Sequence, residues 1–121
     1  MDKTRVNYIV DENNGVVVAE INGCRYDAIE KLNSRFIPNI TSGITVFPTG
    51  WFPKFAMNNK YRAVAKKHPD DEWNETIGKR EALNKLTDVY EAALNRRLAL
   101  FMQKFDQIVG EVANYLSDKK F

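Results

Sequence analysis

Residues 74–117, NETIGKREALNKLTDVYEAALNRRLALFMQKFDQIVGEVANYLS, decide the fold of this chain. The stretch contains no proline and only two glycines, Gly78 and Gly110. Apolar side chains recur along it every three or four residues, which is the period of one helix face: Leu83, Leu86, Tyr90, Leu94, Leu98, Phe101, Phe105, Ile108, Val112 and Tyr115. From Leu94 onward the spacing alternates strictly between four and three, as in a coiled-coil seam. The stretch therefore predicts a long amphipathic helix, or a helical hairpin if the chain breaks near Thr87-Asp88.

This predicted helix is too long for a compact domain. An unbroken helix over residues 74–117 is about 66 Å long at ~1.5 Å per residue, whereas a domain of this size has a radius of gyration near ~14 Å. The helix must break, or it must project and meet a partner. Because a small sheet cannot cover so wide an apolar face, both versions predict a homo-oligomer formed through the C-terminal helices.

The residues before the helix predict a β-meander. Thr4–Val10 alternates apolar and polar residues, and the turn residues of Asp11–Gly15 follow it. Val16–Ile21 is rich in β-branched residues and predicts the central strand. Asn22-Gly23 is a strong signal for a two-residue hairpin, which predicts Cys24–Tyr26 as a third strand.

The next residues change period. Residues 27–35 predict a short helix with Asp27 as N-cap, and Pro38 closes it. A short strand over Gly43–Phe47 and a last strand from Tyr61 to His68-Pro69 are also expected. The predicted fold class is α+β in a single domain of residues 1–121. An N-terminal antiparallel sheet with one short helix (1–68) precedes the long C-terminal amphipathic helix or helical hairpin (74–117).

Composition excludes several classes of protein. The chain has 121 residues, 44% of them hydrophobic, and a net charge of +2. These values fit one folded domain, and they exclude a disordered tail and argue against a nucleic-acid partner. The single cysteine, Cys24, forms no internal disulfide and belongs to no zinc motif, which predicts a reducing compartment. No apolar run is long enough to span a membrane and the start lacks signal-peptide features, so a cytoplasmic protein without a membrane partner is expected.

The densest polar cluster is Lys66–Asn74, KKHPDDEWN, where the last strand leads into the long helix. Such turns bind anions, because free backbone N–H groups and the helix dipole both favour negative charge. Trp73 is suited to stacking on a base, and Asp71 to accepting ribose hydroxyls. An alternative interpretation is purely structural: the acidic residues complement the dipole, Pro69 ends the strand and Asn74 caps the helix.

The sequence predicts no enzyme, no cofactor and no metal. His68 and its neighbouring aspartates form an incomplete metal set, and nothing positions a nucleophile beside them. The aromatic loop, with Phe47, Trp51, Phe52 and Phe55, is expected to be core, interface or ligand wall. On the long helix, Arg96 and its neighbour Arg97 point about 100° apart. They predict a solvated face or an ion pair, and in an oligomer one of them reaches a ligand bound between subunits.

Residues 61–79, YRAVAKKHPDDEWNETIGK, followed by Ala82-Leu83, resemble a module of small bacteriophage proteins. In that module a strand ends in Cys or Lys, and one further residue, Pro, an acidic pair and an aromatic residue follow. A glycine comes four or five residues later, at the start of a helix. Together with the sheet-then-helix order, the module is similar to Thoeris anti-defence proteins, oligomeric sponges that sequester cyclic nucleotide signals.

The resemblance implies a phage protein that evades host antiviral immunity in the cytoplasm of the infected cell. It would bind a cyclic ADP-ribose-type or cyclic oligonucleotide signal without catalysis. Trp73 would stack on the base, Asn74 or Asn84 would bond its edge, and Arg62 would meet a phosphate. The complete set of expected ligand-binding residues is Arg62, His68, Asp71, Trp73, Asn74, Asn84 and Arg96. The alternatives are an inhibitor that binds a host defence enzyme such as a CRISPR nuclease, and a structural accessory protein.

Overall fold

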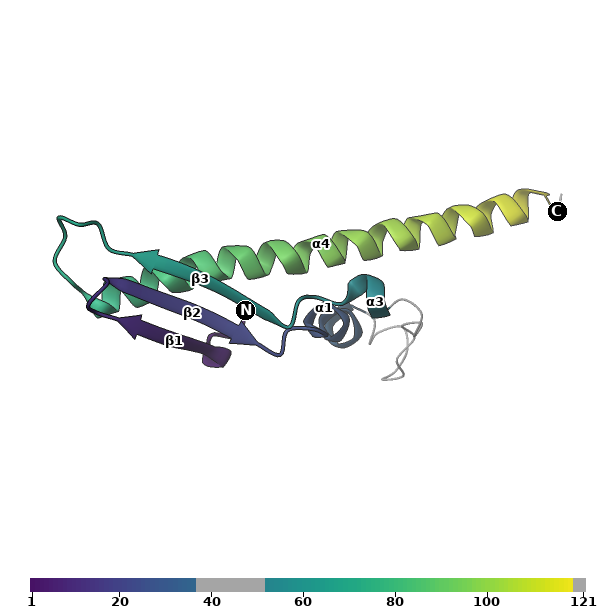
Figure 1. Ribbon diagram of the computed structural model, residues 1–121. Coiled ribbons are helices and arrows are strands. Elements are labelled where there is room, and N and C mark those ends of the chain that lie inside the picture. The colour runs from purple at the N-terminus through teal and green to yellow at the C-terminus, as the bar shows by residue number, and fades with distance from the viewer. Residues whose placement is uncertain (37–51, 119–121) are drawn as a thin grey trace.

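The computed structural model describes residues 1–36 and 52–118. A three-stranded antiparallel sheet lies on one side, and a long helix packs across it and runs on past its end (Figure 1). The strands are β1 (Val6–Asp11), β2 (Val16–Asn22) and β3 (Lys60–Lys66), in the order β1-β2-β3. The long helix, α4, is Glu75–Asp118. The predicted α+β class, with a sheet followed by a C-terminal helix, is confirmed.

Short helical segments complete the described chain. A 3-10 turn, η1 (Lys3–Arg5), precedes β1. The helix expected over residues 27–35 is present as α1 (Asp27–Lys31), which continues as a π-helical turn, η2 (Leu32–Phe36). A single helical turn, α3 (Phe52–Phe55), precedes β3. The strand expected over Gly43–Phe47 and the aromatic residue Trp51 lie outside the described residues.

Strand β2 is central, as its β-branched sequence predicts. Its odd-numbered residues Val17, Ala19 and Ile21 are buried on the face toward α4, whereas the even-numbered ones are only partly covered. This is the period-two pattern of a sheet with one buried face. The turn before β2 ends at Gly15, whose φ of +64° lies in the left-handed region that glycine adopts without strain.

The third strand predicted at Cys24–Tyr26 is wrong. Gly23 turns the chain with a φ of +73°, but the following residues leave the sheet, and the Cys24 N–H bonds to the Asn59 carbonyl at 3.0 Å. The place beside β2 is taken by β3, which pairs along the whole strand from Val16↔Lys66 to Asn22↔Lys60. Seven paired residues outcompete three, because each pair adds ladder bonds and cross-strand contacts.

Helix α4 is continuous, so the helical hairpin and the break near Thr87-Asp88 are wrong. The Thr87 hydroxyl donates to the Leu83 carbonyl at 2.8 Å, the i to i−4 contact that threonine makes within a helix. The helix therefore projects, which was the other outcome that its length allowed. Figure 1 shows its C-terminal half extending beyond the sheet, α1 and α3.

The core lies between the sheet and the first half of α4. The buried residues of the helix are Ala82, Leu86, Tyr90, Ala93 and Leu94, and they pack against inner-face residues of all three strands. A second cluster follows further along the helix, where Ile29, Leu32 and Phe55 pack against Leu98 and Phe101. Phe55 is fully buried, so this member of the aromatic loop is a core residue. No helix within residues 1–36 and 52–118 is long and apolar enough to cross a membrane.

Candidate functional site

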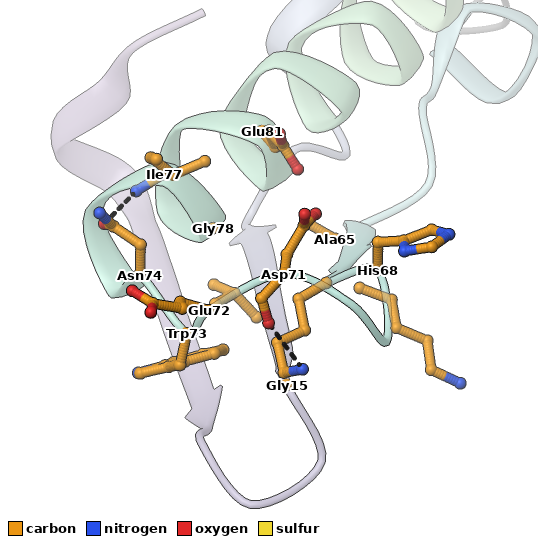
Figure 2. Close-up of a pocket in the computed structure, with 13 residues that line it drawn as sticks. Gly15, Ala65, His68, Asp71, Glu72, Trp73, Asn74, Ile77, Gly78 and Glu81 are labelled. Carbon is orange, nitrogen blue, oxygen red and sulfur yellow. Dashed lines mark hydrogen bonds between the residues drawn. The ribbon is translucent and has the colours of Figure 1, made fainter.

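A pocket of about 590 Å³ lies where the β1–β2 turn, the end of β3 and the start of α4 meet (Figure 2). The β3–α4 connection, residues 67–74, contributes six of its thirteen lining residues. Four of the predicted ligand-binding residues line it: His68, Asp71, Trp73 and Asn74. Gly15, Gly78 and Glu81 close it from the turn and the helix. The strand-to-helix cluster identified in the sequence therefore forms a concave site.

Lys67 ties the two walls of the pocket together. Its backbone N–H donates to the Gly15 carbonyl at 2.8 Å, and its Nζ donates to the Asp71 carbonyl at 3.2 Å. The side chain lies over Gly15 so closely that a Cβ on Gly15 would stand 2.5 Å from Lys67 Cγ. The ammonium group is thus already hydrogen-bonded to its own loop. The backbone bond and the packing of the side chain on Gly15 hold that loop against the β1–β2 turn.

Asn74 begins α4 as a cap. The Ile77 N–H donates to Asn74 Oδ1 at 3.1 Å, and the Gly78 N–H donates to the Asn74 carbonyl at 3.0 Å. The side-chain bond satisfies one of the donors that the first turn of a helix leaves open. The prediction that Asn74 caps the helix is confirmed. Its side chain occupies one of the N–H groups that would otherwise be open to an anion.

Trp73 is half-buried and packs against the main core cluster. Its indole therefore helps to hold the connection on the body of the protein, and the residue is also part of the pocket lining. This double position suits a stacking platform, because a ring that is already packed on one side loses little freedom when a ligand covers the other.

The charged groups of the pocket are mainly acidic. Asp71, Glu72 and Glu81 line it together with Lys66 and the already bonded Lys67. In Figure 2 the Asp71 and Glu81 side chains point toward the same space between the connection and α4. Ionised carboxylates accept hydrogen bonds and donate none, so this arrangement suits hydroxyl and amino groups better than phosphate.

His68 is exposed and lies at the rim. Its Nδ1 accepts the Asp70 N–H at 3.3 Å and lies 3.6 Å from Asp70 Oδ2. In Figure 2 the imidazole points away from the start of α4. The ring is thus engaged with its own loop, and only a ligand that extends beyond the pocket mouth would meet it.

The other three predicted residues lie elsewhere. Arg62 is on the face of the sheet that points away from α4, 3.6 Å from Glu20 on β2, so the expectation that it joins the cluster is wrong for one chain. Asn84 and Arg96 are exposed on α4, about 15 Å and 33 Å along the helix from Asn74 at ~1.5 Å per residue. A single small ligand cannot touch these residues and the pocket together.

Glu81 is a pocket residue that the sequence analysis missed. It follows Asn74 by seven residues, and a spacing of seven returns to nearly the same helix face. That spacing was available in the sequence. Gly15, by contrast, reaches the pocket only through strand pairing, since its partner Lys67 is far away along the chain.

A second polar cluster also escaped prediction. Asp27 Oδ2 accepts from Arg5 Nη1 at 2.9 Å and from the Tyr90 hydroxyl at 2.8 Å, and Arg5 Nη2 lies 3.8 Å from Cys24 Sγ. Asp27 was expected to be the N-cap of α1, but the N-cap is Tyr26, which makes no side-chain capping bond. The Asp27 carboxylate instead accepts the bonds from Arg5 and Tyr90. Burial raises the pKa of the Tyr90 hydroxyl and of the Cys24 thiol above their usual values.

Within residues 1–36 and 52–118 no three His, Cys, Asp or Glu side chains gather as a metal-ligand set. Comparisons with protein-family models, with curated proteins and with solved structures each return no match. The pocket at the start of α4 is the candidate site.

Proposed function

We propose that the protein binds a nucleotide-derived small molecule in the pocket at the start of α4 and acts by stoichiometric capture, without catalysis. The observation that carries the proposal is a cavity of about 590 Å³ that is lined by Asp71, Trp73, Asn74 and Glu81, with His68 at its rim. This volume falls within the range of roughly 300–1,000 Å³ that is usual for small-molecule sites.

The chemistry of the pocket favours the nucleoside part of such a ligand. The Trp73 ring offers a face for a base, a contact that contributes about 1–3 kcal/mol in other proteins. The carboxylates of Asp71 and Glu81 are placed to accept hydrogen bonds from ribose hydroxyls or from an exocyclic amine. With Arg62 on the opposite face of the sheet, the phosphates would lie toward the mouth of the pocket, near Lys66 and His68.

The biological role that we propose rests on the resemblance of residues 61–79 to the phage module. The protein would be a phage anti-defence protein in the cytoplasm of the infected cell, and it would sequester a cyclic ADP-ribose-type or cyclic oligonucleotide immune signal. Sequestration at nanomolar affinity requires about −12 kcal/mol of binding free energy. Base stacking and several carboxylate contacts in one pocket are the features that support such an affinity.

Isothermal titration calorimetry with cyclic ADP-ribose, a cyclic dinucleotide and a cyclic trinucleotide tests the proposal. Native mass spectrometry of protein purified from cells that make these signals shows whether one is carried. We expect one of the three to bind, and Asp71→Asn or Glu81→Gln to weaken it at least ten-fold. The matched controls are Asn84→Ala and Arg96→Ala, exposed residues of the same helix outside the pocket, which should leave the affinity unchanged.

Two results would contradict the proposal. If none of the three signals binds and the purified protein carries no small molecule, capture is not its function. If a signal binds but the controls weaken it as much as the pocket variants do, the ligand occupies another site. Circular dichroism spectra of each variant show whether a lost affinity is only a lost fold.

The second candidate is an inhibitor that binds a host defence enzyme. It is favoured by the apolar row Ile9, Val18 and Val64, which are paired neighbours across the three strands on the face of the sheet away from α4. Ile9 and Val64 are 52% and 48% exposed. For this candidate, Val64→Glu should abolish inhibition while Glu81→Gln has no effect, the reverse of the pattern expected for ligand capture.

A further inference from the structure

The C-terminal half of α4 carries an apolar stripe that the described body of the protein does not cover. We use the name distal stripe for Met102, Phe105, Ile108, Val109, Val112 and Leu116, which are between 39% and 66% exposed. Over Met102–Asp118 every residue is exposed except Lys104, which is half-buried. Contiguous exposed apolar surface of this kind marks an interaction site.

The distal stripe lies on the same side of α4 as the body of the protein. Val112 follows Leu94 by eighteen residues, and Ile108 follows Tyr90 by the same interval, which is five turns at ~3.6 residues per turn. Leu94 and Tyr90 are core residues. The body therefore occupies this side of the helix as far as Phe101, which packs against the cluster of Ile29, Leu32 and Phe55, and no residue of 1–36 or 52–100 buries the same side from Met102 onward.

We infer that the distal stripe binds the distal stripe of a second copy, with the two helices antiparallel and overlapping over Met102–Asp118. A parallel pair is excluded by shape, because each copy's body lies on the side of α4 that faces the other helix, and at the same end. In an antiparallel pair the bodies lie at opposite ends. The overlap then ends where each body begins, so the end of one helix reaches as far as Met102 of the other.

The heptad pattern gives the register of this pair. Phe105, Ile108 and Val112 continue the four-three spacing that begins at Leu94, so they form the seam. An overlap of Met102–Asp118 has its centre at Gly110, which brings Ile108 of one copy against Val112 of the other. Met102 and Leu116, on the flank of the seam, also meet, so the whole distal stripe becomes covered.

The charges of this segment favour the antiparallel direction. Its single cation, Lys104, lies near the beginning, while Glu111 and Asp118 lie further along. All three occupy the same flank of the seam, because they are spaced by seven residues. In the antiparallel register Lys104 of each copy lies beside Asp118 of the other, and the two Glu111 side chains face each other between these pairs, so two attractive contacts stand against one repulsive contact. A parallel pair places Lys104 beside Val109 and leaves its charge without an opposite partner.

The interface lies far from the pocket. Gly78, in the pocket wall, and Met102 are about 36 Å apart along α4 at ~1.5 Å per residue. The inference therefore goes beyond the proposed function and does not depend on it. One pocket lies at each end of the pair, open to solvent.

Disulfide trapping of the full-length protein tests the inference. Ile108→Cys and Val112→Cys are prepared as separate single variants and oxidised alone and as an equimolar mixture. The native Cys24 remains, because it is fully buried and is present in every sample. We expect a cross-linked species of twice the 14.0 kDa chain mass in the mixture only, with at least ten times the yield of either variant alone.

Each other outcome overturns the inference. Efficient cross-linking of each variant with itself would show a parallel pair, since a parallel seam places every residue opposite its own copy. Cross-linking of Ile108→Cys with Phe105→Cys instead of Val112→Cys would show a different register. Light scattering that finds a monomer would rule out the pair, and binding of that monomer to anionic phosphatidylglycerol vesicles would show that a lipid surface covers the distal stripe instead.

Discussion

At the scale of single residues, Gly78 determines how closely α4 approaches the sheet. A Cβ at this position would stand 2.7 Å from Cγ2 of Val17, which is buried on the central strand. Gly110, in the projecting half of the same helix, has nothing within 4 Å of its Cβ position. The two glycines thus form a matched pair in which helix propensity and packing can be separated.

We expect Gly78→Ala to destabilise the protein by up to about 2 kcal/mol. The gain of about 1 kcal/mol in helix propensity is smaller than the cost of about 1–3 kcal/mol for overpacking a buried contact. Gly110→Ala should stabilise the protein by up to about 1 kcal/mol, since only the propensity changes. Urea denaturation followed by circular dichroism measures both, and equal effects of the two substitutions would contradict the close packing at Gly78.

The cluster around Asp27 is the other feature decided at this scale. Arg5, just before β1, and Tyr90, in the first half of α4, both bond to one carboxylate oxygen of Asp27 at the start of α1. The cluster therefore joins these three elements. A hydrogen bond to a charged group contributes about 1.5–3 kcal/mol. Tyr90→Phe should therefore lower the free energy of unfolding by about 2 kcal/mol.

The same cluster predicts a loss of stability at alkaline pH. Burial, and then the bond to Asp27, raise the pKa of Tyr90 above its usual 10.0, and burial raises the pKa of Cys24 above its usual 9.0. Between the unfolded and folded pKa the native state holds protons that the unfolded state releases, so the free energy of unfolding falls as pH rises. We expect a decline beginning near pH 9 and steepening above pH 10. The decline should be shallower in Tyr90→Phe, and an equal slope in both proteins would show that Tyr90 titrates normally.

At the scale of elements, α4 has two halves with different tasks. Its first half is a component of the core, since Ala82, Leu86 and Ala93 are almost completely buried against the sheet. Its second half has an exposed apolar side and contributes little to the folded body. Substitutions in the second half should therefore affect association much more than folding.

Phe105→Asp should convert the pair into monomers and leave the sheet and the first half of α4 folded. Phe105 is 55% exposed, and its ring stacks on Phe101 of the same helix. A charge at this position would be buried without a partner in the pair, which is strongly unfavourable. Gln103→Asp, on the outer side of the helix, is the control. Sedimentation velocity gives the mass of both, and a paired Phe105→Asp would contradict the seam.

At the scale of the whole molecule, the antiparallel pair has a length that scattering can measure. Each α4 of 44 residues is about 66 Å long at ~1.5 Å per residue. Two such helices that overlap over Met102–Asp118 extend over roughly 105 Å at the same rise per residue. Small-angle X-ray scattering should therefore show a maximum dimension above ~100 Å with the mass of two chains. A maximum near ~70 Å with that mass would require complete overlap and would contradict the register.

How far the sequence predicts this protein depends on the range of the interactions involved. The turn at Asp11–Gly15, the central strand at Val16, the cap at Asn74 and the helical period of residues 74–117 depend on neighbours within a few residues. Backbone sterics, period and capping determine these features locally, so all of them could be predicted. The convergence of His68, Asp71, Trp73 and Asn74 was also predictable, since they are close along the chain.

The sequence by itself determined an α+β chain with a long amphipathic helix and a polar connection before it, because periodicity and turn chemistry act locally. Only the tertiary structure decided that β3 displaces Cys24–Tyr26 beside β2, that Arg62 faces away from the pocket, and that Asp27 bonds Arg5 and Tyr90 instead of capping α1. Each of these outcomes is a competition between partners distant in sequence. Its result depends on which pairing buries more surface and satisfies more hydrogen bonds in the complete fold, and no local pattern contains that comparison.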